Sequence, residues 1–211
     1  MVVLCVDLKS FYASVECILR GLDPYKTNLV VADKERGPGS IVLAVSPHLR
    51  SYGVSSRCRI YDLPKDLEII YAKPRMKKYI EYSSKIYRIY LKYVDKEDIH
   101  VYSIDEAFID LATYLKYYNK PPLEIAAAIV ADIFYETGIT ASCGVGNNMF
   151  LAKVALDILA KHQPNHLAYL DQELFKKHIW DIMPLREIWG IGSGIEKRLN
   201  RMGVYTLRDL A

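Results

Sequence analysis

Two short, largely apolar runs enclose a pair of adjacent carboxylates, and this pattern most constrains the fold. Residues 99–102 and 107–111 form the two runs, and the segment between them contains Asp105 and Glu106. Runs of this length joined by a few polar residues predict an antiparallel hairpin with acidic residues at its turn. We therefore expect a sheet that presents two negative charges at one end of a strand pair.

A third carboxylate lies near the end of the first apolar run of the chain. Residues 2–8 are apolar except for Asp7, which is typical of a buried strand that carries an acidic residue to a sheet edge or a cleft. Residues 11–19 then follow helical spacing, so a strand-to-helix turn is expected around residues 7–10. The N-terminus of a helix favours phosphate, which makes this turn a candidate phosphate contact.

The other long patterns indicate an α+β fold in which helices back a mixed sheet. Helices are predicted over residues 78–94, 123–136 and 148–160, and a strand over residues 139–145. Helical and strand patterns that alternate in this way predict a layered α+β domain.

Two smaller regions differ from this pattern. Residues 20–72 contain short apolar runs broken by Gly and Pro, which predicts a small insert of short strands. After Pro164 we expect a separate small helical unit, with helices over residues 171–178, 186–188 and 194–202 and from 206 onward. The last predicted helix is still open at Ala211, so we expect a domain of a longer protein.

Composition excludes several classes of protein. The chain has 51% hydrophobic and 25% charged residues, as ordinary globular proteins do, and it has no apolar run near the roughly 20 residues that cross a bilayer. The net charge of +3 is too small for a histone-like grip on nucleic acid. The four cysteines lack the close spacing of a zinc site, which favours reduced thiols. We expect a soluble cytoplasmic protein.

The acidic residues suggest a metal site. Asp105 and Glu106 would repel each other unless a cation lay between them, and Mg²⁺ prefers carboxylate and phosphate oxygens. With Asp7 they would complete a two-metal site of the kind used in nucleotidyl transfer, with Arg50 and Lys161 as candidates to neutralise a triphosphate. Taken alone, an acidic pair at a hairpin turn is more often a solvated turn, and that alternative stays open.

A second motif suggests contact with DNA. Gly190 and Gly192 lie between predicted short helices, which fits a helix-hairpin-helix whose glycines let backbone N–H groups approach a phosphate. Lys197, Arg198 and Arg201 follow on the next helix, where they could continue the contact. A Gly-x-Gly segment alone is more often only a turn, and the basic helix beside it favours the DNA interpretation.

Several segments, in order, resemble the Y-family DNA polymerases. Residues 6–16 (Val-Asp-Leu-Lys-Ser-Phe-Tyr-Ala-Ser-Val-Glu) resemble the family's opening motif, and residues 102–107 (Tyr-Ser-Ile-Asp-Glu-Ala) its most characteristic one. Residues 143–153 resemble the segment after the catalytic hairpin, and residues 190–192 the thumb. Within the family the chain is most similar to bacterial UmuC-type proteins.

The resemblance covers essentially the whole chain and implies its domains. The palm would comprise residues 1–18 and 73–163, the fingers residues 19–72, and the thumb, with the helix-hairpin-helix, residues 164–211. The little-finger domain, which binds further DNA in this family, would lie outside this chain.

The resemblance also implies roles for individual residues. Asp7, Asp105 and Glu106 would hold two Mg²⁺ or Mn²⁺ ions, with the backbone carbonyl of Leu8 as a further ligand. Phe11 and Tyr12 would contact the triphosphate through their backbone, and the ring of Tyr12 would be the steric gate that excludes a ribose 2′-hydroxyl.

The remaining nucleotide contacts are implied by position. Arg50 and Lys161 would pair with the β- and γ-phosphates. Many family members carry a tyrosine three residues before the fingers arginine, whereas this chain has Pro47, which offers neither a hydroxyl nor a backbone N–H. Ser46 or His48 would then make the missing phosphate contact.

The implied function is template-directed, low-fidelity translesion DNA synthesis in DNA repair and the SOS response. Its partners would be primer-template DNA, deoxynucleoside triphosphates and a sliding clamp bound through a segment outside this chain. Two alternatives remain: a non-catalytic DNA-binding relative, and a palm-fold nucleotide cyclase. A cyclase would not need the helix-hairpin-helix, and a non-catalytic relative would be expected to lose one of the three carboxylates.

Overall fold

The computed structural model describes residues 2–211 and divides them into two compact units. The first contains the chain up to Asp7, residues 91–131 and residues 141–211. The second contains residues 8–90 and 132–140. No helix among the described residues combines the length and apolar character that a bilayer crossing requires. The division into palm, fingers and thumb stays a prediction.

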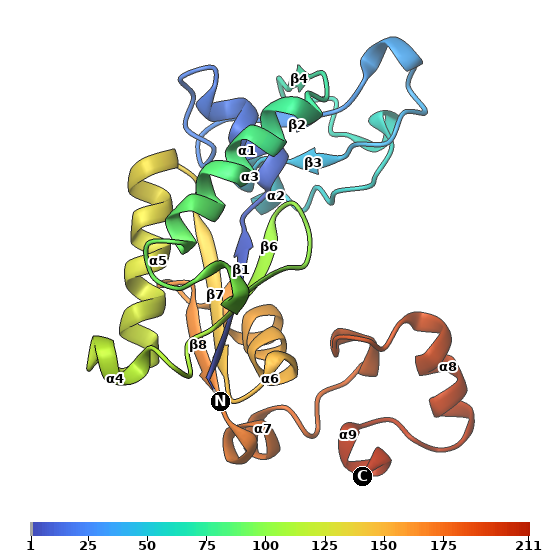
Figure 1. Cartoon of the computed structure of the whole chain (residues 1–211). Helices are drawn as coiled ribbons and strands as arrows, with labels where there is room; N and C mark the ends of the chain where they lie inside the picture. The colour runs from blue at the N-terminus through green and yellow to red at the C-terminus, as the bar shows by residue number, and fades with distance from the viewer. Residues whose placement is uncertain (1) are drawn as a thin grey trace. The chain divides into compact units, whose positions relative to one another are not determined.

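The first unit is built on a five-stranded sheet with the strand order β5-β6-β1-β7-β8. The strands are β1 (Val3–Leu8), β5 (Ile99–Val101), β6 (Glu106–Asp110), β7 (Ala141–Gly146) and β8 (Leu167–Leu170). Strands β1, β6 and β5 pair antiparallel, while β7 and β8 pair parallel. The predicted α+β class, with a mixed sheet backed by helices, is therefore confirmed (Figure 1).

Most helices follow the predicted patterns, but residues 47–51 and 115–118 form short helices where none is predicted. They are α1 (Phe11–Ile18), α2 (Pro47–Ser51), α3 (Met76–Tyr90), α4 (Leu115–Tyr118), α5 (Pro122–Thr137), α6 (Met149–Val154), α7 (Gln172–His178), α8 (Ser193–Arg201) and α9 (Leu207–Leu210). The side chains of Asn148, Asp171 and Thr206 cap α6, α7 and α9 by accepting backbone N–H bonds.

Two glycines bring α6 unusually close to the sheet. A Cβ atom at Gly144 would collide with the backbone carbonyl of Ala152, and one at Gly146 would collide with the backbone of Leu151 and Ala152. Both glycines lie on β7, and only a strand that has no side chain at these two positions allows α6 to lie this close to the sheet. This approach places α6 and the residues after it over one face of the sheet.

The segment after α6 differs from the single helix predicted over residues 148–160. The α-helix ends at Val154, a π turn covers Ala155–Leu159, and a 3₁₀ turn covers Ala160–His162. The apolar pattern is similar for all three kinds of helix, so it could not reveal the change.

Two strand predictions also need correction. Only helices are predicted after Pro164, but residues 167–170 form β8, which pairs with β7. A strand of four residues is too short to show the two-residue alternation of apolar side chains. It forms because β7 offers it a hydrogen-bonding partner, which the local sequence does not reveal. Within the insert of short strands predicted over residues 20–72, the apolar run 41–45 forms a strand only at Ala44–Val45, with Ile41 in an isolated bridge to Arg59.

The second unit contains a three-stranded sheet and a buried ionic cluster. Strands β3 (Ala44–Val45), β2 (Leu29–Val31) and β4 (Ile70–Ala72) form the sheet. The side chain of Glu16, on α1, is fully buried and accepts hydrogen bonds from the guanidinium groups of Arg20 and Arg75 and from the hydroxyl of Tyr79.

This cluster controls the charge of Glu16. Burial alone would raise its pKa, but the hydrogen bonds from Arg75, Arg20 and Tyr79 outweigh burial, and the pKa of Glu16 is lowered. A carboxylate held in this way ties α1 to α3 and to the segment before it.

We expect Glu16→Gln to destabilise the protein by about 1–3 kcal/mol, because two partly exposed guanidinium groups and the hydroxyl of Tyr79 would lose a charged hydrogen-bond acceptor. The Glu16 pKa is lower in the folded state, so its contribution is complete above the unfolded pKa of about 4.3 and is lost as the pH falls through the folded value. Urea denaturation should therefore show that the difference in free energy of unfolding between the two proteins is larger at pH 7 than in acid. Glu35→Gln, which breaks the exposed Lys73–Glu35 pair, should change stability little.

Candidate active site

Two of the three predicted carboxylates face each other across neighbouring strands. Asp7 on β1 is the register partner of Glu106 on β6, and residues paired in this way have Cβ atoms about 4.5–5.5 Å apart. Asp105 immediately precedes β6, where the hydroxyl of Ser103 donates to its carboxylate at 2.7 Å. The hairpin turn is closed by the N–H groups of Tyr102 and Ser103, which both donate to the carbonyl of Glu106. The predicted acidic hairpin is confirmed.

Two lysines from the segment after β7 contact these carboxylates. Lys153 Nζ lies 2.8 Å from Glu106 Oε1, and Lys161 Nζ lies 3.4 Å from Asp7 Oδ2. Asp157 lies between the lysines, 3.1 Å from Lys153 and 2.9 Å from Lys161. The site is thus an alternating row of negative and positive groups, in which each ammonium is shared by two carboxylates.

The π turn explains how Lys153, Asp157 and Lys161 reach the same face. In an α-helix, eight residues rotate the side chain by about 800°, which is roughly 80° past two full turns. The hydrogen bonds of a π turn close from residue i to i+5, so each revolution takes in more residues and the rotation per residue falls. The π turn at Ala155–Leu159 therefore returns Lys161 towards the direction of Lys153.

Electrostatics in the site favour a bound cation. Burial raises the pKa of Asp7 to about 6; Lys161 opposes this rise, while the negative charges of Asp105 and Glu106 add to it. Burial lowers the pKa of Lys153, but the bonds to Glu106 and Asp157 outweigh it and the pKa is raised. The thiol of Cys5, which donates to Glu106 Oε1 at 3.3 Å, has a pKa raised by burial and by Glu106 and is therefore unreactive.

The donor chemistry of the site fits a divalent ion such as Mg²⁺. All three acidic side chains supply hard carboxylate oxygens, and their mutual repulsion would be relieved by positive charge. Among residues 2–211, however, no three acidic, His or Cys side chains converge as a ready-made metal cage. The ammonium groups of Lys153 and Lys161 lie beside the carboxylates, and the partly exposed Lys161 is the one that an ion would displace, from Asp7.

The predicted metal ligand Leu8 belongs to the second unit, as do four of the predicted nucleotide residues, Phe11, Tyr12, Ser46 and Arg50. The fifth nucleotide residue, Lys161, belongs to the first unit. Phe11 and Tyr12 begin α1 directly after Ser10, whose φ of 47° is left-handed. The ring of Tyr12 stacks on Tyr79 with centroids 4.3 Å apart.

Ser46 has a structural role that conflicts with the predicted phosphate contact. Its side chain is buried, its hydroxyl donates to Thr27 O, and its oxygen accepts from the N–H groups of Leu29 and Leu49. These bonds use its hydrogen-bonding capacity. Ser46 caps α2, and Pro47 occupies the first helical position, where a missing N–H does no harm. Arg50 is exposed at the end of the same helix.

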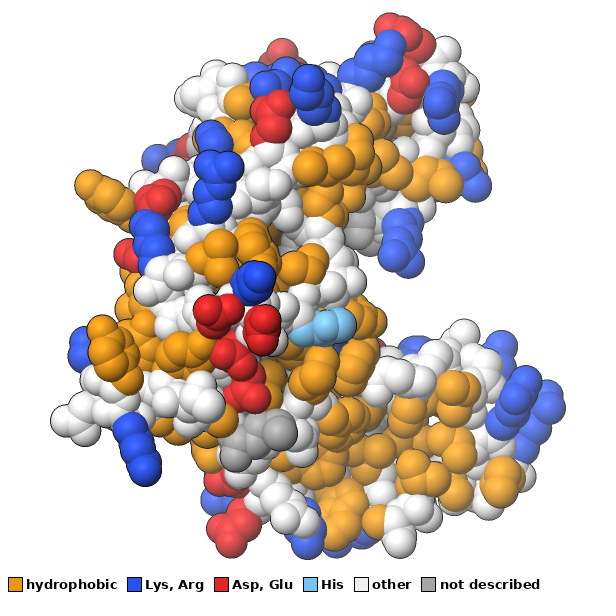
Figure 2. Space-filling model, viewed as in Figure 1, with side chains coloured by type: hydrophobic (Ala, Val, Ile, Leu, Met, Phe, Trp, Pro, Cys, Tyr) orange, Lys and Arg blue, Asp and Glu red, His pale blue; other side chains and the backbone are white. Residues whose placement is uncertain are grey.

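The predicted DNA-binding residues lie together in the first unit. Gly190 has a φ of +89°, which favours glycine, and Gly192 is the N-cap of α8. Lys197, Arg198 and Arg201 are all exposed on α8, and basic side chains gather over this helix in Figure 2.

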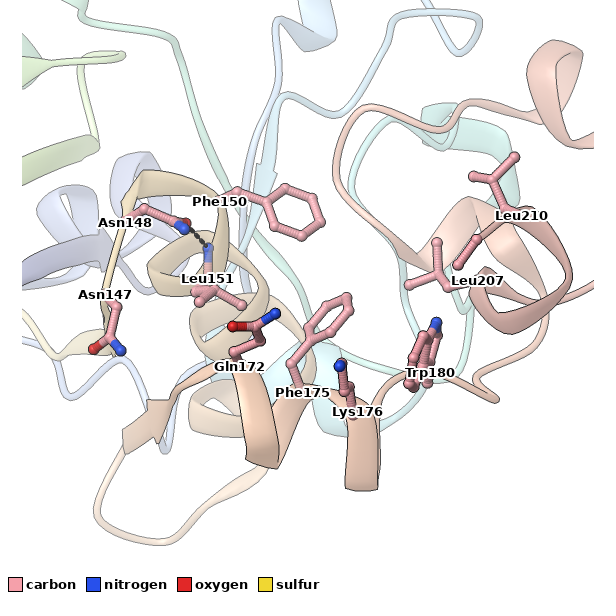
Figure 3. Close-up of a pocket in the computed structure, with 11 residues that line it drawn as sticks. Asn147, Asn148, Phe150, Leu151, Gln172, Phe175, Lys176, Trp180, Leu207 and Leu210 are labelled. Carbon is pink, nitrogen blue, oxygen red and sulfur yellow. Dashed lines mark hydrogen bonds between the residues drawn. The ribbon is translucent and has the colours of Figure 1, made fainter.

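A cavity of about 630 Å³ lies between α6, α7 and α9, away from the carboxylates. Phe150 and Phe175 line one side of it, and Leu207 and Leu210 lie on the other (Figure 3). None of the predicted catalytic residues lines this cavity, and we assign it no part in the chemistry.

Sequence reasoning missed three residues of the site. Lys153 lies in the segment 143–153 that resembles the Y-family polymerases, but no catalytic or binding role is predicted for it. Asp157 and Cys5 are not predicted as site residues. The available signal was a Lys-Asp-Lys series at four-residue steps in an otherwise apolar segment, because charges in such a segment need partners.

Comparison with known proteins agrees with this geometry. A model of the impB/mucB/samB family matches residues 6–157. The putative UV-damage repair protein UvrX of Bacillus subtilis (strain 168) is 38% identical over 210 residues, which is 99% of this chain and 49% of that protein. DNA polymerase IV 2 of the same organism is 36% identical over 213 residues, 100% of this chain and 50% of that protein. The chain thus spans about half the length of these curated relatives.

Solved structures show the same fold. DinB from Sulfolobus solfataricus matches with a TM-score of 0.80 and 31% identity, over 100% of this chain and 60% of that one. The insertion ternary complex of Dbh DNA polymerase matches with a TM-score of 0.84 and 30% identity over the same shares.

We expect saturating Mg²⁺ or Mn²⁺ to raise the melting temperature by roughly 5 °C, because an ion that binds only the folded state stabilises it. Asp105→Asn should remove most of this shift. Asp110→Asn is the matched control, because Asp110 ends the strand that Asp105 precedes, and it should keep the full shift. Equal shifts in all three proteins, measured by calorimetry, would contradict the metal site.

Proposed function

Because the chain belongs to the impB/mucB/samB family, whose solved relatives include Y-family DNA polymerases, we propose that it catalyses template-directed DNA synthesis. It would add deoxynucleotides to a primer 3′ end, with low fidelity and in translesion repair. The observation that carries the proposal is the pairing of Asp7 with Glu106 across β1 and β6, with Asp105 at the adjoining turn.

Members of this family are metal-dependent nucleotidyltransferases, and here Asp7, Asp105 and Glu106 would hold the ions, with the carbonyl of Leu8 as a further ligand. Two bound Mg²⁺ ions would supply charge stabilisation for the attacking and leaving oxygens. The remaining work of this chain is to bind the nucleotide, neutralise its charge and orient the primer end.

Lys161 is placed so that its ammonium group could pair first with Asp7 and then with a bound nucleotide. Its ammonium contacts Asp7 at 3.4 Å and is one-third exposed, so it could leave Asp7 for a triphosphate oxygen when an ion takes over that carboxylate. Lys153 is nearly buried and tied to Glu106 and Asp157, so it would stay in place. In the second unit, Arg50, with an exposed side chain, stays a predicted phosphate contact, and His48 replaces Ser46 as the candidate for the additional contact.

Low fidelity would follow from the region predicted as fingers. The longest helix between residues 19 and 72 is α2, with five residues. So short a helix offers little surface to close over a nascent base pair, and geometric checking would be weak.

DNA would be gripped through its backbone at the Gly190–Gly192 turn and at Lys197, Arg198 and Arg201, because such contacts do not depend on base sequence. A sliding clamp would bind through a segment outside this chain. Such an enzyme would work in the cytoplasm.

The decisive test is single-nucleotide extension of a primed DNA template with Mg²⁺, at low salt and high enzyme concentration. We expect template-directed incorporation, reduced at least about a hundredfold in Asp105→Ala because the site loses charge stabilisation. Asp110→Asn should extend like the unaltered chain. Absence of incorporation, despite measurable binding of primer-template, would contradict the proposal and favour a non-catalytic relative.

A second experiment tests the steric gate. Tyr12→Ala should raise the incorporation of ribonucleotides relative to deoxyribonucleotides at least about tenfold, because the ring that would clash with the 2′-hydroxyl is removed. Tyr61→Ala, at an exposed tyrosine of the same unit, is the control. A Tyr12 variant that still rejects ribonucleotides would rule out the gate assignment.

A further inference from the structure

Five aromatic rings from separate segments form a continuous series in the first unit. Trp189 lies 6.1 Å from Tyr102 and 6.2 Å from Phe108, and Tyr102 lies 5.8 Å from Phe108 (centroid distances). Phe150 lies 6.5 Å from Trp189, and Phe175 lies 5.8 Å from Phe150. All are within the range in which aromatic rings attract each other, and the Tyr102–Trp189 pair, at 77°, is edge-to-face.

One end of this series lies against the strands that carry the carboxylates. Phe108 follows Glu106 by two residues on β6, and side chains two apart on a strand share a face. Tyr102 precedes the acidic turn and donates its backbone N–H to Glu106 O. Trp189 is half-buried and packs on the buried cluster that contains Cys5 and Phe108. The indole therefore rests on the catalytic face of the sheet.

The middle ring of the series, Trp189, is joined directly to the predicted DNA-binding turn. Trp189 immediately precedes Gly190, and α8 begins two residues after Ile191. Glu196 on α8 is buried and accepts hydrogen bonds from the backbone N–H of Arg186 at 3.2 Å and from its guanidinium at 3.3 Å. These bonds tie the basic helix to the segment that ends in Trp189.

We propose that Trp189 is a positioning residue, which holds the Gly190–Gly192 turn at a set distance from the hairpin of Asp105 and Glu106. A primer-template gripped at α8 would then present its primer end to the carboxylates. The inference rests on the proposed function, because it explains how DNA bound at α8 would place the primer end beside the carboxylates. It predicts that losing the indole harms alignment more than it harms affinity.

The first test separates these two effects. Trp189→Ala, Trp189→Phe and the unaltered chain are compared for primer-template affinity and for the rate of single-nucleotide addition at saturating DNA and nucleotide. We expect Trp189→Ala to lower the saturated rate roughly tenfold or more, since small misplacements of reacting groups have large effects, while the dissociation constant for DNA changes little. Trp189→Phe should recover most of the rate. Trp180→Phe, at the other tryptophan of the chain, is the matched control and should match the unaltered chain.

A double-mutant cycle tests the route. If Trp189 acts through Tyr102, the rate losses of Trp189→Ala and Tyr102→Leu should not add, because both break the same contact. If Trp189→Ala fails to fold, judged by its melting curve, Trp189→Phe and Tyr102→Leu carry the test. A saturated rate equal to that of the unaltered chain, a loss confined to DNA affinity, or strictly additive losses would each overturn the inference.

Fluorescence distinguishes failure of this inference from failure of the proposed function. In Trp180→Phe, Trp189 is the sole tryptophan, and its emission should change when primer-template binds. A chain that binds DNA without extending it would count against the polymerase alone. Emission that stays unchanged on DNA binding would overturn the role of Trp189.

Discussion

The site depends on how closely α6 approaches β7. Gly144 and Gly146 leave no side chains between strand and helix, so the backbone of residues 151–156 lies directly on the sheet. At this depth the ammonium of Lys153 reaches the carboxylate of Glu106, and the following turns bring Lys161 to Asp7. A methyl group at either glycine would lift the helix and separate both pairs, because the neighbours are backbone atoms that cannot swing away.

The close packing of α6 on β7 also balances the charges of the site. Three acidic side chains at the ends of two strands would repel one another, and the lysines make the arrangement stable before any ion or nucleotide arrives. The two cations differ in their surroundings. Lys153 is almost fully enclosed, whereas Lys161 is partly open to solvent. One is therefore suited to hold Glu106 permanently and the other to change partners as charge enters the site.

The sequence predicted the features that depend on local pattern. The hairpin around Asp105, the strand that carries Asp7 and the helix after it, and the turn at Gly190 are all present. What it could not predict depends on contacts between distant segments. Strand β8 exists because β7 offers it a partner, and Ser46 is enclosed by backbone groups of residues 27–29. The pairing of Lys153 with Glu106 joins residues 47 apart in the chain, and no local period carries that information.

The π turn at Ala155–Leu159 has a consequence for how helix length can vary at this site. It accommodates one residue more than an α-helix would between two side chains on the same face. Two turns of regular α-helix contain about 7.2 residues, so a relative without the π turn would carry the counterpart of Lys161 seven residues after that of Lys153 instead of eight. A single-residue insertion could thus enter this helix without moving either ammonium group. A sequence alignment that allows no gap in this helix would then pair the wrong residues of two such chains.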